Sequence, residues 1–120
     1  MAGTPGPVHI EIPGYSDWEG TFTWYTSSAK TTPKDLSTYT ARLDFRRKKS
    51  DTSALASLTS GSGITLGGSA GTIVVALAAA TTADITPGWG YWDLEIIDAS
   101  SNPLRLVEGT AEFTESVTRN

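Results

Sequence analysis

The first residue whose type could support chemistry is His9, the only histidine in a chain without cysteine. An imidazole can act as a general base or bind a metal, but structural zinc sites draw four ligands from Cys and His. No cluster of Asp and Glu with ligand spacing joins His9, and no triad motif surrounds it. Because it stands between Val8 and Ile10 in an alternating segment, we expect an outward-facing surface side chain.

Asp93 and Glu95 are the second candidate pair, two residues apart on one face of a predicted strand. Paired carboxylates can perform the acid–base work of glycosidases or bind calcium. Because both uses require a cleft and further ligands, we expect a solvated sheet face instead. The sequence therefore predicts no catalytic residue, no metal and no cofactor, and we expect a protein that is not an enzyme.

The four tryptophans allow three interpretations: core packing, stacking on sugar rings, or anchoring of a protein interface. Strand phase places Trp24 and Trp92 in the core. Trp18 falls in a turn-like segment with Tyr15, and Trp89 follows Pro87-Gly88. Trp18, Trp89 and Tyr15 are therefore the aromatic candidates for contact with a ligand or partner.

The one basic run is Arg46-Arg47-Lys48-Lys49, at the end of a predicted strand. It suits either a patch for phosphates or an acidic partner, or a solvated strand end followed by a turn. The net charge of −4 favours the second interpretation and gives no electrostatic footprint for nucleic acid. The four residues remain interface candidates.

Length and composition indicate one domain of 120 residues that can bury a core without disulfides. The N-terminus lacks the basic and apolar regions of a signal peptide. The longest apolar run, at residues 73–80, is far shorter than the roughly 20 residues that span a bilayer. We expect a soluble protein, made in a cytoplasm, with no membrane partner.

Period-two alternation and turn residues predict an all-β fold. Strands are expected at residues 8–12, 20–26, 39–47, 54–58, 64–66 and 72–78, with hairpin turns at 61–63 and 67–71 and a single helical turn near 79–84. Residues 1–7 are expected to form a flexible arm, and residues 27–37 a polar contact loop. About seven to nine short strands at this spacing favour an immunoglobulin-like antiparallel β-sandwich over residues 8–120.

The last third of the chain, residues 85–120, predicts a β-hairpin. Trp92, Leu94 and Ile96 face inward, and the intervening carboxylates face outward. Residues 98–103 form the connecting loop, in which Asp98 can accept hydrogen bonds from the backbone.

Seven segments carry a family resemblance: DLSTYTARL (35–43), GITL (63–66), GTI (71–73), PG (87–88), WDLEI (92–96), LVEGT (106–110) and VTR (117–119). Together they resemble small virion proteins of tailed phages, similar to the N-terminal domain of phage baseplate upper proteins. That domain is an immunoglobulin-like β-sandwich that joins receptor-binding parts to the tail. The likeness spans residues 20–119 and is strongest from residue 92 to residue 119.

The resemblance implies a structural virion protein, an adaptor in the tail, baseplate or fibre-attachment region. Its partners would be other virion proteins, contacted by several symmetric copies, and its location the virion. Baseplate upper proteins continue into a long stalk, whereas this sequence stops at Asn120, so we do not expect it to present a distant receptor-binding head itself. A capsid decoration protein is the first alternative. A carbohydrate-binding module that uses Trp18 and Trp89 is the second.

Overall fold

The computed structural model describes residues 7–26 and 31–117. Eight strands form one continuous sheet in the order β1-β8-β7-β3-β4-β5-β6-β2. Their bounds are β1 Pro7–Pro13, β2 Trp18–Thr23, β3 Thr40–Arg46, β4 Ala56–Ser60, β5 Gly63–Leu66, β6 Thr72–Leu77, β7 Gly88–Ile97 and β8 Pro103–Thr114. The 3₁₀ turn η1 (Gly68–Ala70) joins β5 to β6, and the short helix α1 (Ala79–Ala83) joins β6 to β7.

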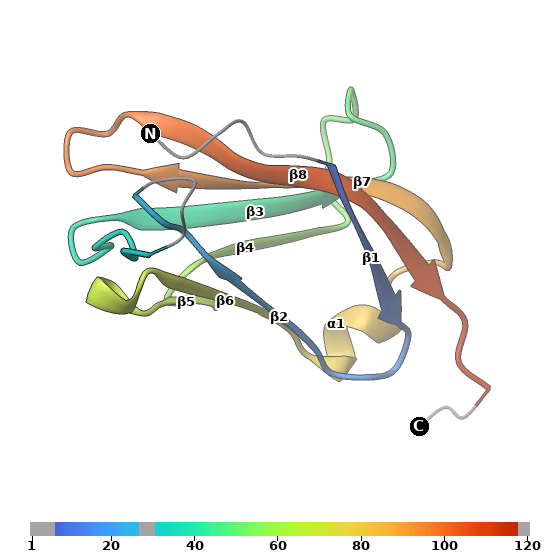
Figure 1. The fold of residues 1–120 in the computed structure, drawn as a ribbon. Coiled ribbons are helices and arrows are strands. Elements are labelled where there is room, and N and C mark those ends of the chain that lie inside the picture. Colours follow the sequence, from blue (N-terminus) through green and yellow to red (C-terminus); the bar gives the residue numbers. More distant parts are fainter. Residues whose placement is uncertain (1–6, 27–30, 118–120) are drawn as a thin grey trace.

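The sheet is rolled into a shape close to a barrel, with β1 and β2 at the two ends of its strand order (Figure 1). The predicted all-β class, the helical turn and the C-terminal hairpin are confirmed. An immunoglobulin-like division into two sheets is not confirmed, because hydrogen-bonded pairs link all eight strands into one sheet. The predicted arm at residues 1–7 lies outside the described residues except for Pro7, which begins β1.

Two strand pairs are parallel, so the expectation of a wholly antiparallel sheet is wrong. β1 runs parallel to β8, and β4 runs parallel to β5 over two residue pairs. The segment at residues 61–63, which was predicted to be a hairpin turn, instead connects two strands that run in the same direction. Gly61 and Gly63 adopt φ angles of 87° and 97° at this connection, a backbone conformation that glycine permits. Alternation reveals which face of a strand is apolar but not its partner or direction, so the sequence pattern did not reveal these pairs.

The interior is filled by the inward side chains that alternation predicts. Trp92 is 3% exposed, and its indole N–H donates to the carbonyl oxygens of Val8 at 3.3 Å and Thr110 at 3.1 Å. Its ring also lies 5.6 Å from that of Phe22 in β2. Trp92 therefore joins three strands inside the barrel. The other fully or nearly buried apolar residues include Ile12, Leu36, Leu43, Phe45, Ile64, Ile73, Val75, Leu77, Leu94, Ile96 and Phe113.

The predicted contact loop at residues 27–37 is only partly described. Residues 27–30 lie outside the described part, and the remainder is not wholly exposed. Leu36 is buried, and its N–H donates to the Gly68 carbonyl at 2.8 Å. Tyr25 and Pro33 form an isolated bridge. The C-terminal part of this segment thus packs on the barrel, where a polar pattern predicted exposure.

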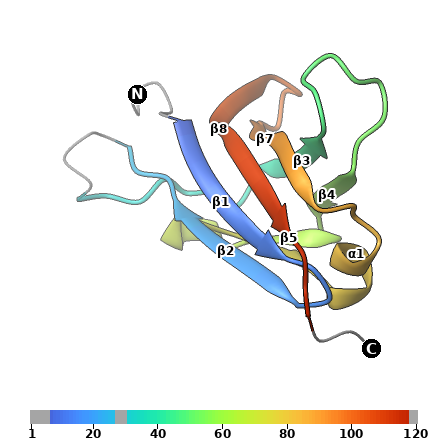
Figure 2. The same ribbon diagram turned by 90° about the vertical axis from the view of Figure 1, so that its right-hand side faces the viewer.

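The turn between β1 and β2 is held against α1. Buried Thr82 donates from its hydroxyl to the Ser16 carbonyl at 2.9 Å and accepts from the Ser16 N–H at 3.1 Å. Asp17 accepts the N–H of Ala79, the first residue of α1, at 2.8 Å. These bonds fix the C-terminal end of β1, where the strand converges on β2 (Figure 2).

The contact between β1 and β8 depends on Gly109. A Cβ atom at this position would lie 1.7 Å from the Val8 carbonyl oxygen, much closer than real atoms approach. Only glycine allows the two backbones to approach so closely. The outward residues of the two strands are brought side by side as a result. Among the described residues, no helix has the length and apolar character needed to cross a membrane.

Candidate binding face

The outward side chains of β1, β8, β7 and β3 form one continuous surface, here called the charged face. Alternation places them opposite the core residues of the same strands. Its members are His9, Glu11, Arg42, Asp44, Arg46, Trp89, Tyr91, Asp93, Glu95, Arg105, Glu108, Thr110 and Glu112.

Strand register arranges the charges in rows across this face. Asp44, Asp93 and Glu108 are cross-strand partners and form a row of three carboxylates. Arginines flank the row: Arg46 lies 2.8 Å from Asp44, and Arg105 lies 3.4 Å from Asp93. Like charges directly opposite each other repel, so the arginines are needed to offset the row.

Asp93 occupies the centre of this arrangement. Burial raises the pKa of its carboxyl group, and the neighbouring carboxylates Glu95, Asp44 and Glu108 raise it further, while Arg105 lowers it. The predicted solvated pair Asp93 and Glu95 is therefore half-buried, because Arg105 pairs with Asp93 and Arg42 pairs with Glu95. Alternation predicted their face correctly but not the arginines that cover them.

A hollow of about 450 Å³ lies over this part of the charged face. Its lining residues are Arg42, Asp44, Arg46, Lys49, Tyr91, Trp92, Asp93, Glu95, Arg105 and Glu108. At one side Lys49 holds its ammonium group 5.4 Å from the centre of the Tyr91 ring, within cation–π range. Small-molecule pockets are mostly apolar, so this open hollow with charges of both signs suits a polar protein surface better.

The basic run does not act as one patch. Arg46 and Lys49 line the hollow. Arg47 instead donates to the carbonyl oxygens of Trp89 at 2.8 Å and Thr86 at 2.7 Å, and so stabilises the start of β7. Lys48 is exposed in the turn that follows β3. The predicted interface role is thus geometrically open to Arg46, Lys48 and Lys49, while Arg47 has a structural task.

The aromatic candidates differ in exposure and in their place on the barrel. Trp89 is 57% exposed and Tyr91 is 40% exposed, and they lie two residues apart on the charged face. Trp18 was predicted to lie in a turn, but it is the first residue of β2. Its side chain is half-buried against the core and shares the inward phase of Phe22. Tyr15 is exposed in the β1–β2 turn, away from the hollow, with a φ angle of 57°. Sequence phase missed Tyr91 as a candidate.

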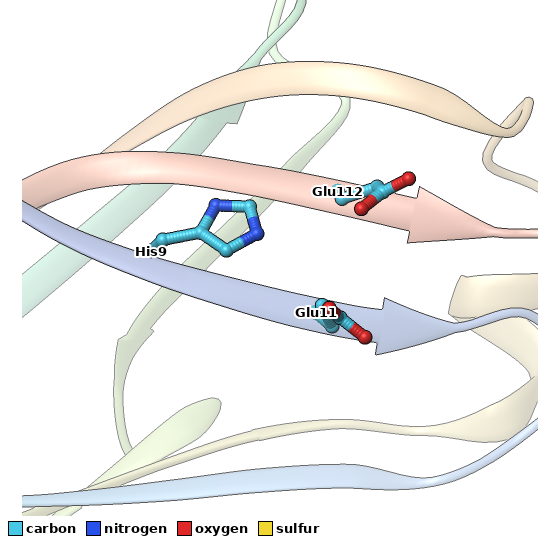
Figure 3. A group of neighbouring side chains, drawn as sticks. All are labelled: His9, Glu11 and Glu112. Carbon is cyan, nitrogen blue, oxygen red and sulfur yellow. The ribbon is translucent and has the colours of Figure 1, made fainter.

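At the β1 edge of the charged face, His9, Glu11 and Glu112 come together. Glu11 and Glu112 are cross-strand partners, and His9 lies two residues before Glu11. Their nearest ligand atoms all lie within 4.8 Å of one another. His9 Nδ1 is 2.9 Å from the Thr110 hydroxyl, and the other ring nitrogen points toward the two carboxylates (Figure 3).

This group corrects the expectation that no acidic cluster joins His9. Glu112 lies 101 residues after Glu11 along the chain, so only the pairing of β1 with β8 brings it there. The available signal was weak: His9 and Glu11 share the outward phase of one strand, and Glu112 has the outward phase of another. Nothing in the sequence indicates that these two strands are neighbours.

Comparison with known proteins does not assign the chain to a family. No protein-family model matches the chain, and a search of curated proteins finds no significant match. The resemblance to tailed-phage virion proteins therefore remains a prediction from the sequence.

Proposed function

We propose that the protein is a structural, non-enzymatic module that docks onto neighbouring proteins of a tailed-phage particle, in the tail, baseplate or fibre-attachment region. The observation that carries this proposal is the charged face, where exposed Trp89 and Tyr91 stand beside a hollow lined by both signs of charge. Aromatic side chains surrounded by polar groups are typical anchors of protein interfaces. The location in a phage particle rests on the family resemblance.

The mechanism is binding without chemistry. Trp89 and Tyr91 bury their rings against the partner, and the arginines and carboxylates of the hollow set its orientation through complementary charge. Several copies around a symmetric particle make individually weak contacts strong through avidity.

Two other functions use the same residues. A capsid decoration protein would dock through the same face onto a different neighbour. A carbohydrate-binding module would stack a sugar ring on Trp89, which the 57% exposure of this side chain allows. Half-buried Trp18 is less suited to such stacking.

The first test is the composition of particles. The genes beside this one should encode tail-fibre or baseplate proteins, and mass spectrometry of purified particles from that genome should detect the chain. Neighbouring capsid genes and recovery with emptied heads would support decoration instead. Absence of the chain from complete particles would refute both structural functions.

The second test is mutational. A deletion of the gene is complemented with the wild type, with the double variant Trp89→Ser and Tyr91→Ser, or with Thr21→Ala and Thr65→Ala on the opposite side of the barrel. We expect the aromatic double variant to fold, as judged by circular dichroism, but to be lost from particles, while the threonine variant is incorporated. Equal incorporation of both variants would remove the charged face as the docking surface.

Glycan binding is tested separately by titrating the purified protein with soluble oligosaccharides and following tryptophan fluorescence. A response that Trp89→Ser abolishes, in a chain that particles do not contain, would establish the carbohydrate-binding alternative.

A further inference from the structure

The group formed by His9, Glu11 and Glu112 has the composition and spacing of a metal-ion site. One imidazole nitrogen and two carboxylates converge from two neighbouring strands, with ligand atoms within 4.8 Å of one another. Around a tetrahedral ion with bonds of about 2.1 Å, ligand atoms lie about 3.4 Å apart. Closing the group requires movements of about 1 Å, which side-chain rotation supplies.

Within the described part of the chain, neither carboxylate forms an ion pair with a lysine or arginine. Glu11 and Glu112 are directly paired across β1 and β8, where like charges repel. Every ion pair found among residues 7–26 and 31–117 involves other residues, in contrast to the arginine-paired carboxylates of the hollow. A bound cation would remove this repulsion.

The imidazole is already oriented for coordination. The Thr110 hydroxyl lies 2.9 Å from Nδ1, and the ring is stacked on Trp89 with centroids 4.9 Å apart. A hydrogen bond at one ring nitrogen fixes the orientation of the other in many metal sites. Here the other nitrogen, Nε2, is the one turned toward the carboxylates (Figure 3).

We propose that His9 Nε2 and the carboxylates of Glu11 and Glu112 bind one divalent transition-metal ion of the Zn²⁺ class. A mixed nitrogen and oxygen ligand set suits such ions, whereas Ca²⁺ takes about 6–8 oxygen ligands. Three protein ligands leave a coordination position for water. This site is separate from the hollow and does not depend on the proposed docking function.

The ion would fasten the edge strand β1 to β8. Two ligands come from β1 and one from β8, so the bound ion bridges the strands outside the barrel, as the Trp92 indole links them inside. A ligand that binds only the folded state stabilises it by mass action. With Zn²⁺ at a hundred times its Kd, we expect Tm to rise by roughly 10 °C.

The single histidine makes the experiment specific. Tag-free protein, freed of metal with a chelator, is titrated with ZnCl₂ and followed by calorimetry and by two-dimensional NMR of the imidazole nitrogens. We expect one ion per chain and a shift of the Nε2 resonance, with Nδ1 keeping its proton. Parallel titrations with CaCl₂ and MgCl₂ should give much weaker binding.

Variants assign the site. His9→Ala and Glu112→Gln should each lower Zn²⁺ affinity by more than about tenfold and abolish the rise in Tm. Glu19→Gln, an exposed outward position on β2, is the matched control and should bind like the wild type. All three positions are at least partly exposed, so the variants should fold, and circular dichroism checks this.

Three results would overturn the proposal: no binding at millimolar Zn²⁺, binding that survives both His9→Ala and Glu112→Gln, or Ca²⁺ binding as tight as Zn²⁺ binding. None of these results bears on particle incorporation, so the failure of this site and the failure of the docking function can be told apart.

Discussion

The two halves of the barrel share an apolar interior but present different exteriors. In the half formed by β1, β8, β7 and β3, the outward residues are the charges and aromatics of the charged face. The other half, formed by β2, β6, β5 and β4, presents Glu19, Thr21, Thr23, Ser57, Thr59, Gly63, Thr65, Thr72, Val74 and Ala76. Glu19 is the only charged residue of this second set, here called the threonine face.

The difference indicates which half contributes to recognition and which contributes mainly to the core. The inward residues of the two halves, such as Leu94 and Val75, are of the same apolar type, because both halves bury one face against the same core. The threonine face adds little beyond side chains that fit a pleated surface. Ion pairs, cation–π contacts with Tyr91 and the His9 group all lie on the charged face. Recognition is therefore expected on that half.

The largest expected effect comes from removing the side chain that joins the halves. Trp92→Ala leaves a cavity between β7 and Phe22 of β2, and removes the donor to the Val8 and Thr110 carbonyls. We expect the free energy of unfolding to fall by about 3–5 kcal/mol. Urea denaturation followed by circular dichroism measures this. Trp89→Ala, at an exposed position, is the control, and an equal loss there would contradict the contrast between interior and face.

The second effect is confined to one half. Gly109→Val places side-chain atoms against the Val8 backbone, so β1 must move away from β8. We expect a loss of about 1–3 kcal/mol, typical of overpacking. Hydrogen exchange should show reduced protection in β1, with β2 and β6 unchanged. Thr21→Val on the threonine face is the control. Uniform loss of protection across both halves would show that they do not respond separately.

The third effect is a pH dependence with opposite signs at two carboxyl groups of one hairpin, Asp93 within β7 and Asp98 in the loop that follows it. The raised pKa of Asp93 means that the folded state binds its proton more tightly, so stability is lost as pH rises from the ordinary value of 3.8 through the raised one. Hydrogen bonds from Asn102 and Ser100 lower the pKa of Asp98, so its contribution is present above 3.8 and lost as pH falls through the lowered pKa.

As the pH rises from 2 to 7, the wild type should therefore lose stability relative to Asp93→Asn and gain stability relative to Asp98→Asn. Thermal melts of the three proteins at matched ionic strength measure the two differences. If both variants diverged from the wild type in the same direction, burial and the neighbouring carboxylates would not raise the pKa of Asp93 in the folded state.

The smallest effect concerns a surface ion pair. Arg42→Gln removes the contact with Glu95 and should lower the free energy of unfolding by about 0.2–1 kcal/mol at low salt. The difference should vanish near about 1 M NaCl, because salt screens exposed charges. Thr65→Ala on the threonine face should show no such salt dependence. A salt-independent effect of Arg42→Gln would indicate lost packing of its aliphatic stem instead.

Local sequence patterns predicted most elements of this fold. β3, β6, β7 and β8 alternate so regularly that their inward residues, such as Phe45 and Ile96, were assigned correctly. The helical turn and the Asp98 loop followed from alanine clustering and turn chemistry. The patterns failed where a partner was needed: Trp18 was placed in a turn, and β1 was expected to pair antiparallel.

The candidate site was predicted less well, for a related reason. The outward phase of Asp93, Glu95 and His9 was readable from their own strands, whereas the ion pairs with Arg105 and Arg42 and the approach of Glu112 depend on which strands are neighbours. Tyr91 was missed because exposure at the edge of a hollow is a property of the assembled face.

The sequence by itself determined the all-β class, the two faces of each strand and the side chains available for chemistry. These are properties of one strand at a time, because a period of two residues assigns every side chain to a face. Only the tertiary structure decided that β1 lies parallel to β8, and thereby that His9 meets Glu112. Strand pairing is set by packing of the whole core and by the close approach at Gly109, which join residues a hundred positions apart.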